Sequence, residues 1–300
     1  MIWVDQILQG ALLGGYYALI ACGLSFMFGV MRIINLAHGD LAILAAYLIW
    51  AIAEQAQVSP FVAILIVIPI MAVLGWALQR FVLERSLRSG ILVPLLSTFG
   101  LAVVLQNLLF AQFGADTRSL APDIGDLAYD SWTITGQLYI GKLAALIFAV
   151  AVALLGGLHL FLARTNLGRA IRATAEDPDA AELSGVDARA VYAAATAIAM
   201  ITVTLAGAAL GMRAAFGPYT GPAQLIFAFE AVVIGRLGSL WGTLIGGVVL
   251  GVAQNVGALI HPHGFLIAGH LVFLLVLGFR LLRLDGDWRS RLRVLLGTRL

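Results

Sequence analysis

The sequence predicts an all-α membrane protein, a polytopic bundle of about eight transmembrane helices with one or two broken or re-entrant segments. The first observation is charge: only 11% of the 300 residues are charged and 61% are apolar, whereas a soluble domain usually carries about 25% charged residues. The second is that long apolar runs recur along the whole chain. The third is that no segment between them is long enough for a soluble domain, so residues 1–300 are expected to form a single transmembrane domain.

A helix that spans a bilayer needs roughly 20 predominantly apolar residues. Two apolar runs are shorter than this: residues 41–53, which follow a polar stretch, and residues 223–235, which would be about 20 Å long at 1.5 Å per residue. The first long run is too long for the apolar part of a signal peptide and is interpreted as a span. The bundle should therefore have eight or nine segments, two of them irregular. The clear candidates for spans are residues 7–30, 61–79, 91–113, 141–163, 191–212, 241–259 and 265–282.

Arginines gather in three regions, and clusters of basic residues mark cytoplasmic loops. Two of the regions are the loop at residues 80–88 and the loop at residues 164–190, and the third is the C-terminal tail at residues 283–300 with the neighbouring Arg280. The loop at residues 114–140 instead carries four aspartates. We expect this acidic loop outside the cell and the three basic regions in the cytoplasm. The side of the N-terminus stays open, because it depends on whether the irregular segments cross the membrane.

Small residues at four-residue spacing predict close helix contacts in lipid, because they let two backbones approach each other. Gly10 and Gly14 form one such stripe, and Gly238, Gly242 and Gly246 form another. We interpret both stripes as helix-packing surfaces.

The sequence argues against an enzyme. A P-loop ends in Gly-Lys-Ser/Thr, but the single lysine, Lys142, is followed by leucine. No Gly-x-Ser-x-Gly elbow and no His-Glu-x-x-His pair occurs. His261 and His263 form a histidine pair without an evident third ligand, which is a weak basis for a metal site. We therefore expect no catalytic residues, no cofactor and no metal.

Two polar features fall where lipid-facing chain cannot hold them. The first contains Asn35, His38, Gly39 and Asp40, just before the short run 41–53. Irregular backbone at membrane depth is tolerated only where protein or a water-filled cavity covers it, so this stretch is either a broken helix that lines a cavity or an interfacial loop. In the broken-helix interpretation, Gly39 would sit at the break and a helix starting near Asp40 would direct its amides into the cavity. Asp40 would then either cap that helix or meet a substrate amino group.

The second polar feature is Glu230, which lies inside the short run 223–235. An ionisable residue within a membrane segment faces a partner or a cavity. Glu230 is therefore either a substrate ligand or half of a structural pair, and both interpretations stay open. The candidate partners by residue type are Arg213, Arg236 and Gln254.

The loop at residues 164–190 has the local signals of two short helices. Asp177 can cap a helix that has Pro178 at its first position, and Gly185 can end it. Leu183 and Val186 would be exposed on this helix unless something covers them. The loop is therefore a docking site for a cytoplasmic partner or a hairpin folded back on the bundle.

Residues 168–185 resemble the coupling-loop signature of bacterial ABC importer permeases, specifically the branched-chain amino acid permease family. The shared pattern is Gly-Arg-Ala-x-Arg-Ala, here with Arg169 and Arg172, followed by an acidic-Pro segment and a Leu-x-Gly turn. Residues 34–40 also resemble the family's hallmark near the second membrane segment. Residues 235–247 resemble its glycine-rich segment, although Arg236 stands where the family keeps a second glycine.

The resemblance implies a permease subunit in the bacterial inner membrane, crossing it several times. It implies two cytoplasmic ATPase subunits, a second and usually non-identical permease subunit, and a periplasmic binding protein that delivers an amino acid or related small molecule. No nucleic acid is expected as a partner. The residues that the family pattern assigns to ATPase coupling are Arg169, Arg172, Asp177, Pro178, Leu183 and Gly185, and the substrate path is expected at Asn35, His38, Gly39, Asp40 and Glu230. The alternative is a passive small-solute channel with re-entrant half-helices, which would not need the docking loop.

The predicted orientation can be tested by labelling. Single cysteines in the loop at residues 114–140 and in the tail at residues 283–300, on a Cys22→Ala background, are exposed to a membrane-impermeant thiol reagent in intact cells. We expect labelling of the loop only. Labelling of the tail and not the loop would reverse the orientation.

Overall fold

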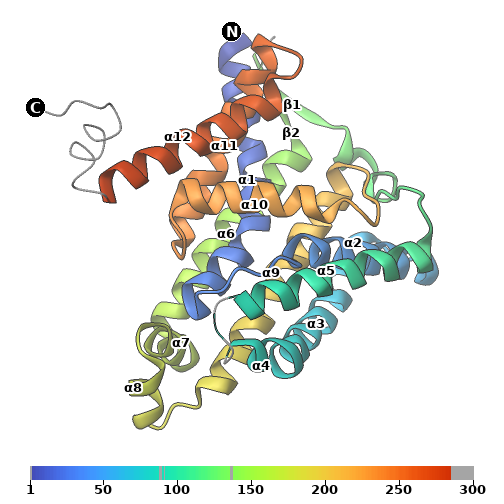
Figure 1. Ribbon diagram of the computed structural model, residues 1–300. Helices are drawn as coiled ribbons and strands as arrows, with labels where there is room; N and C mark the ends of the chain where they lie inside the picture. The colour runs from blue at the N-terminus through green and yellow to red at the C-terminus, as the bar shows by residue number, and fades with distance from the viewer. Residues whose placement is uncertain (1, 88–89, 91, 136–137, 285–300) are drawn as a thin grey trace, which may run out of the picture.

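The computed structural model describes residues 2–87, 90, 92–135 and 138–284, and it is a bundle of helices with one small β-hairpin (Figure 1). Eight helices in this part of the chain are long and apolar enough to cross a membrane, as the composition predicts. They are α1 (Ile2–Met31), α2 (His38–Ala56), α3 (Pro60–Leu78) with its continuation through η1 (Gln79–Leu83) into α4 (Glu84–Leu87), α5 (Leu92–Phe113), α6 (Lys142–Arg164), α9 (Ala188–Arg213), α11 (Leu240–Ile260) and α12 (Gly264–Leu284).

The centre of the bundle is α1, which is buried over most of its length and packs against α6, α9, α10 and α11. Gly10 and Gly14 lie directly against α11: a Cβ added at Gly14 would be 2.4 Å from the Cα of Val248. The facing residue of α11 is also a glycine: a Cβ added at Gly251 would be 2.2 Å from the Gly10 carbonyl oxygen. The two helices therefore touch backbone to backbone.

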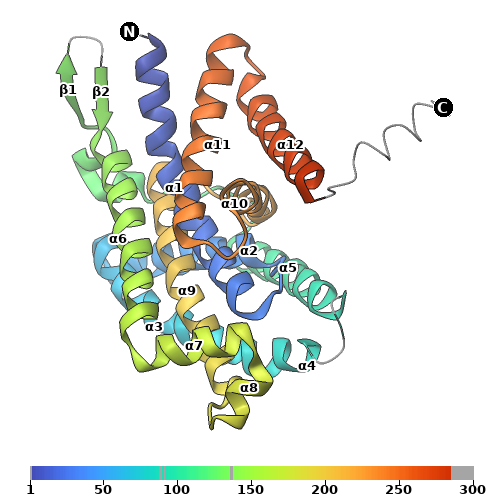
Figure 2. The same cartoon turned by 90° about the vertical axis from the view of Figure 1, so that its left-hand side faces the viewer.

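The short helix α10 (Gly221–Gly235) runs across α1 in Figure 1 and is seen end-on in Figure 2. It packs tightly on α11, because a Cβ at Gly242 would lie 1.9 Å from the Gly235 carbonyl oxygen and one at Gly246 would lie 2.0 Å from that of Ala231. Gly238 does not belong to this helical stripe, although its spacing predicts that it should. It precedes α11 in a turn, with φ of 77°, and lies beside Gly29 of α1.

The predicted break near Asp40 lies earlier in the chain. After α1 ends, residues 32–37 form the irregular connection, and Arg32 has a positive φ of 55°. The next helix, α2, begins at His38 rather than near Asp40, so Gly39 and Asp40 belong to its first turn. The expected short segment 41–53 is thereby extended to 19 residues and joins the eight candidate spans.

The two main loops lie at opposite ends of the molecule (Figure 2). The loop 114–140 contains η2 (Ala121–Ala128) and the antiparallel strands β1 (Ser131–Thr135) and β2 (Leu138–Gly141), near the N-terminal end of α1. The loop 164–190 contains α7 (Asn166–Glu176) and α8 (Pro178–Leu183), near α4. An ion pair of 3.5 Å between Arg189 and Glu84 joins the two basic loops. We call the end with the hairpin the hairpin end and the other the α8 end.

The predicted tail, residues 283–300, lies outside the described residues beyond Leu284. Arg280, grouped with it by sequence, has a role inside the bundle. Its guanidinium donates a hydrogen bond of 2.9 Å to the carbonyl oxygen of Ile234, at the end of α10. This contact satisfies a terminal carbonyl that a short helix would otherwise leave unpaired.

Candidate functional site

The α7–α8 loop is built from local signals. Thr165 caps α7 by accepting a hydrogen bond of 2.9 Å from the Gly168 amide. Gly168 lies flat against α6, where an added Cβ would be 2.3 Å from the Phe161 carbonyl oxygen. The start of α7 is therefore fixed to the end of α6.

The next helix, α8, has the caps that the sequence predicts. The carboxylate of Asp177 accepts from the Ala180 amide at 3.0 Å, and Pro178 is the first helical residue. Gly185 has a φ of 85°, a left-handed conformation that glycine adopts without steric cost. Leu183 is 91% exposed at the tip, whereas Val186 is half-buried against the core. Of the two side chains expected to be exposed, only Leu183 is.

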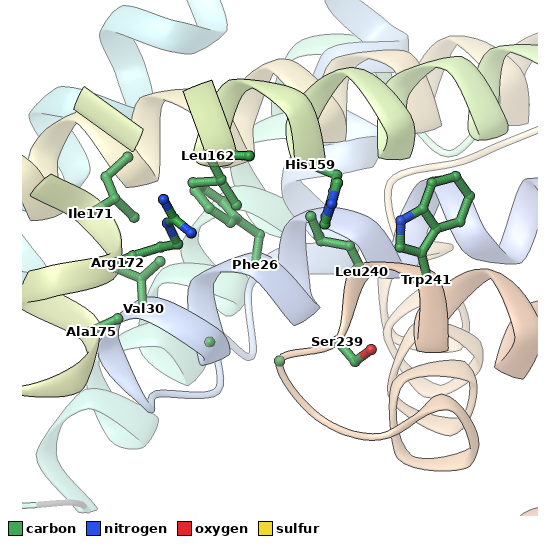
Figure 3. A pocket seen from close by; sticks show the side chains of 13 residues that line it. Phe26, Val30, His159, Leu162, Ile171, Arg172, Ala175, Ser239, Leu240 and Trp241 are labelled. Atoms are coloured by element: carbon green, nitrogen blue, oxygen red, sulfur yellow. The ribbon is translucent and has the colours of Figure 1, made fainter. Parts of the chain in front are cut away.

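The two arginines of the loop differ in their surroundings. Arg169 donates to the side-chain oxygen of Asn166 within α7. Arg172 instead borders a cavity of about 370 Å³ between α7, the end of α1, α6 and the turn before α11. Figure 3 shows it with His159 and Trp241 around this space. The cavity thus lies between the coupling-loop pattern and the glycine-rich segment, two motifs that are distant in the sequence.

The polar stretch around residue 38 is buried. Asn35 accepts from the Ala37 amide at 3.0 Å, just before α2. The N-cap residue of α2 is Ala37, without a side-chain cap, so Asp40 does not hold the capping position expected of it. A ring nitrogen of His38 lies 2.7 Å from the Ile20 carbonyl oxygen, and Asp40 accepts a 3.0 Å hydrogen bond from the Gln106 amide. Gln106, a polar residue in the long apolar segment 91–113, was not singled out by sequence.

This stretch is also packed tightly. A Cβ at Gly39 would lie 2.0 Å from the carbonyl oxygen of Gly221, so the first turns of α2 and α10 are in backbone contact. One side-chain nitrogen of Asn35 and one of His38 are buried with no hydrogen-bond partner in the described residues. Buried polar groups normally have partners, so these two orphaned nitrogens set this junction apart from ordinary packing.

Glu230 has a partner that the sequence reasoning missed. Its carboxylate pairs with Nδ1 of His270, on α12, and its second oxygen is buried without a partner in the described residues. The partners expected from the sequence are engaged elsewhere or exposed. Gln254 accepts from the Tyr17 hydroxyl at 2.5 Å, the Arg213 guanidinium lies 4.7 Å from the centre of the Tyr16 ring, and Arg236 is exposed in the turn after α10.

The sequence does contain a feature that points to His270 as the partner of Glu230. It is an ionisable residue inside an apolar segment, and such residues pair with one another at membrane depth. The sequence could not show that α12 folds back along α10, which brings the two together. Among the described residues, no group of three His, Cys, Asp or Glu could hold a metal ion.

Comparison with known proteins gives a consistent result. The family model described as branched-chain amino acid transport system / permease component matches residues 6–279. BraD of Pseudomonas aeruginosa, a high-affinity branched-chain amino acid transport system permease protein, is 32% identical over 85% of this chain and 86% of its own. LivH of Escherichia coli, described in the same words, is 29% identical with the same coverage. A chain of PsaBC from Streptococcus pneumoniae, solved in complex with Fab, has a TM-score of 0.47 at 16% identity, with 98% of both chains covered.

The Glu230–His270 pair can be tested by a double-mutant cycle on thermal stability. His270→Leu leaves the buried Glu230 carboxylate without its partner. Because the His270 side chain is 46% exposed, the loss of stability should be smaller than for a fully buried pair. We expect this variant to aggregate at a clearly lower temperature in detergent. The double variant with Glu230→Gln should recover most of the loss, because no charge remains to be buried. Equal stability of His270→Leu and the wild type would contradict a structural pair.

Proposed function

Because this chain belongs to the branched-chain amino acid permease family, we propose that it is the membrane-spanning permease subunit of an ATP-driven importer for branched-chain amino acids or related small molecules. The observation that carries this function is the α8 tip. A capped helix projects from the bundle with Leu183 91% exposed, and an apolar side chain presented in this way suits a groove on a partner. A passive channel has no use for such a surface.

We propose that cytoplasmic ATPase subunits are the partners at this tip. The chain cannot supply the energy itself through a P-loop, since Lys142 is its only lysine and precedes a leucine. In this assignment Arg169, Arg172, Asp177, Pro178 and Gly185 shape the loop, and Leu183 enters the ATPase. The close backbone contact of Gly168 with α6 supports the proposal, because a docking helix transmits movement only if it is rigidly attached to the bundle.

We propose that the hairpin end faces the periplasm, where a binding protein delivers the substrate, and that the α8 end faces the cytoplasm. The distribution of arginine supports this orientation. A second permease subunit, non-identical as the family pattern implies, completes the transporter within the lipid.

We propose that Asn35, His38, Gly39, Asp40 and Glu230 line the substrate path, closed in this conformation. The support is chemical. The polar side chains among them are enclosed between helices, and Asn35, His38 and Glu230 each keep a buried polar atom without a partner in the described chain. Leaving a buried polar group unsatisfied costs about 1–3 kcal/mol, a cost that a purely structural junction would avoid with apolar side chains.

The ATPase dock predicts a specific loss of coupling. Leu183→Ala removes the exposed side chain without altering the caps of α8, so the permease should fold and insert normally. We expect reduced co-purification of the ATPase, or uptake reduced by tenfold or more. Truncating an interface hot spot costs about 2 kcal/mol or more, and this is the role proposed for Leu183. Leu160→Ala on α6, where the leucine is 54% exposed, is the matched control. Undiminished coupling in Leu183→Ala would refute the dock.

The path proposal is tested at Asp40. Asp40→Asn keeps an acceptor for Gln106 and removes the charge, Asp40→Ala removes both, and Gln106→Leu keeps the charge without its partner. If the charge serves transport, both Asp40 variants lose uptake while remaining folded, and Gln106→Leu retains part of it. If only the hydrogen bond matters, Asp40→Asn transports normally. Normal uptake by Asp40→Ala would remove this stretch from the path.

A further inference from the structure

Arg213 is the last residue of α9, and it lines a cavity together with Tyr129 and Gly141 at the hairpin end of the bundle. Its guanidinium lies over the ring of Tyr16, 4.7 Å from the ring centre. Within the described chain, no carboxylate lies within ion-pair distance of it. Arg213 therefore has no acidic partner and borders a cavity. Its guanidinium carries five N–H donors that can bind a ligand.

Arg213 lines two cavities. Each has a volume of about 260 Å³, and both are lined by Arg213 together with Ala144 and Ile147 of α6. The first cavity is lined by residues of α1, α6, α9, α11 and α12, some apolar and some polar. The apolar lining residues include Leu12, Leu13 and Phe265, and the polar ones include Gln9 and Asn255.

The polar groups of the first cavity have complementary roles. The amide nitrogens of Gln9 and Asn255 already donate to backbone carbonyl oxygens, at 2.6 Å to Tyr139 and 3.1 Å to Gly251. Their side-chain oxygens carry no partner in the described residues and are left as acceptors. The cavity therefore offers a cationic fork, two neutral acceptors and an apolar surface.

We propose that this cavity binds the transported amino acid at the hairpin end and that Arg213 holds its carboxylate. A guanidinium binds a carboxylate through two parallel hydrogen bonds. The ammonium group then binds the oxygens of Gln9 and Asn255, and a branched aliphatic side chain contacts the apolar residues Leu12, Leu13 and Phe265. This inference rests on the proposed import of amino acids, and it adds the residue that recognises the carboxylate on the side where the substrate arrives.

The test measures occupancy of the cavity directly. A single cysteine is placed at a position that lines both cavities, by Ala144→Cys on a Cys22→Ala background in the complete transporter with its ATPases. The rate of alkylation by a small thiol reagent is followed with leucine, with 4-methylpentanoate, which lacks the ammonium group, and with isopentylamine, which lacks the carboxylate. We expect protection by leucine, weaker protection by 4-methylpentanoate and none by isopentylamine. Protection by isopentylamine equal to that by leucine would overturn the proposal.

Variants locate the effect at one side chain. Arg213→Gln should raise the leucine concentration needed for protection by about tenfold or more, as expected for losing hydrogen bonds to a charged group. Arg213→Lys, which keeps the charge but not the fork, should lie between the two. Lys142→Gln removes a cation at the same end, one that pairs with Asp130 at 2.6 Å, and should behave as the wild type. Unchanged protection in a folded Arg213→Gln transporter would refute the assignment.

A lipid headgroup could also supply an anion to Arg213, so the same alkylation is measured in two kinds of vesicle. Vesicles of phosphatidylcholine alone are compared with vesicles that contain phosphatidylglycerol, and we expect equal rates without leucine. Slower alkylation in the anionic vesicles, abolished by Arg213→Gln, would identify a lipid phosphate as the occupant and overturn the amino-acid assignment.

Leucine uptake by the wild-type complex is measured separately, so that failure of the site and failure of the proposed function can be distinguished. We expect uptake by the wild type and a marked loss in Arg213→Gln. Absence of uptake by the wild type would count against the proposed function, whereas uptake that persists unchanged in Arg213→Gln would count against this site alone.

Discussion

The backbone contact between α1 and α11 is the constraint on which the rest of the structure depends. Lipid is as apolar as the side chains of the helices, so the hydrophobic effect does not hold membrane helices together and close packing must do so. Gly10 and Gly14 on one helix meet Gly247 and Gly251 on the other, and an added Cβ at any of these four positions would lie 2.2–2.6 Å from the facing backbone. No side chain can take these places without separating the helices. Because α1 also contacts α6, α9 and α10, a shift at this seam would move the walls of the cavities that α1 borders.

The seam also determines how polar groups are accommodated. With α1 fixed, its two neighbouring tyrosines reach different helices: Tyr16 donates to Gln224 of α10 and Tyr17 to Gln254 of α11, each at 2.5 Å. The short helix α10 then lies across the bundle, and α12 supplies what its length leaves unsatisfied, a histidine for Glu230 and a guanidinium from Arg280 for the last turn. Irregular or short elements at membrane depth persist only where protein satisfies their polar groups. Here the partners of Glu230 and of the last turn of α10 come from α12, and both helices pack against α11.

Local features of this chain could be predicted and distant contacts could not. The caps of α8 follow from Asp177, Pro178 and Gly185, because each acts within four residues of its own position. The eight candidate spans follow from composition and the length of a bilayer crossing. The partners of Asp40 and Glu230 depend instead on how α5 and α12 are placed, and residue type alone suggested two arginines and Gln254 in place of His270. Gly238 shows the same limit, since its spacing fits a helical stripe while its backbone forms the turn that contacts Gly29. Pairing the few polar residues within apolar segments, which include Gln106 and His270, would have come closer to both contacts.

The helix α6 connects the two ends of the molecule. At the α8 end, Phe161 of α6 contacts Gly168 in the first turn of α7. His159 of α6 also lines the cavity that Arg172 borders. At the hairpin end its residues Ala144 and Ile147 line both cavities beside Arg213. Its 23 residues extend about 35 Å at 1.5 Å per residue, a distance over which a packed helix moves as one body. A displacement of α7 that tilts or shifts α6 would therefore also change the cavities at the hairpin end, without any intervening chain of side-chain rearrangements. Coupling of this kind requires two discrete packings of α6 on α1. Gly15 of α1 contacts Phe148 of α6, and an added Cβ at Gly15 would lie 2.7 Å from both the backbone and the ring of Phe148. The two packings of α6 on α1 would have to differ at this contact.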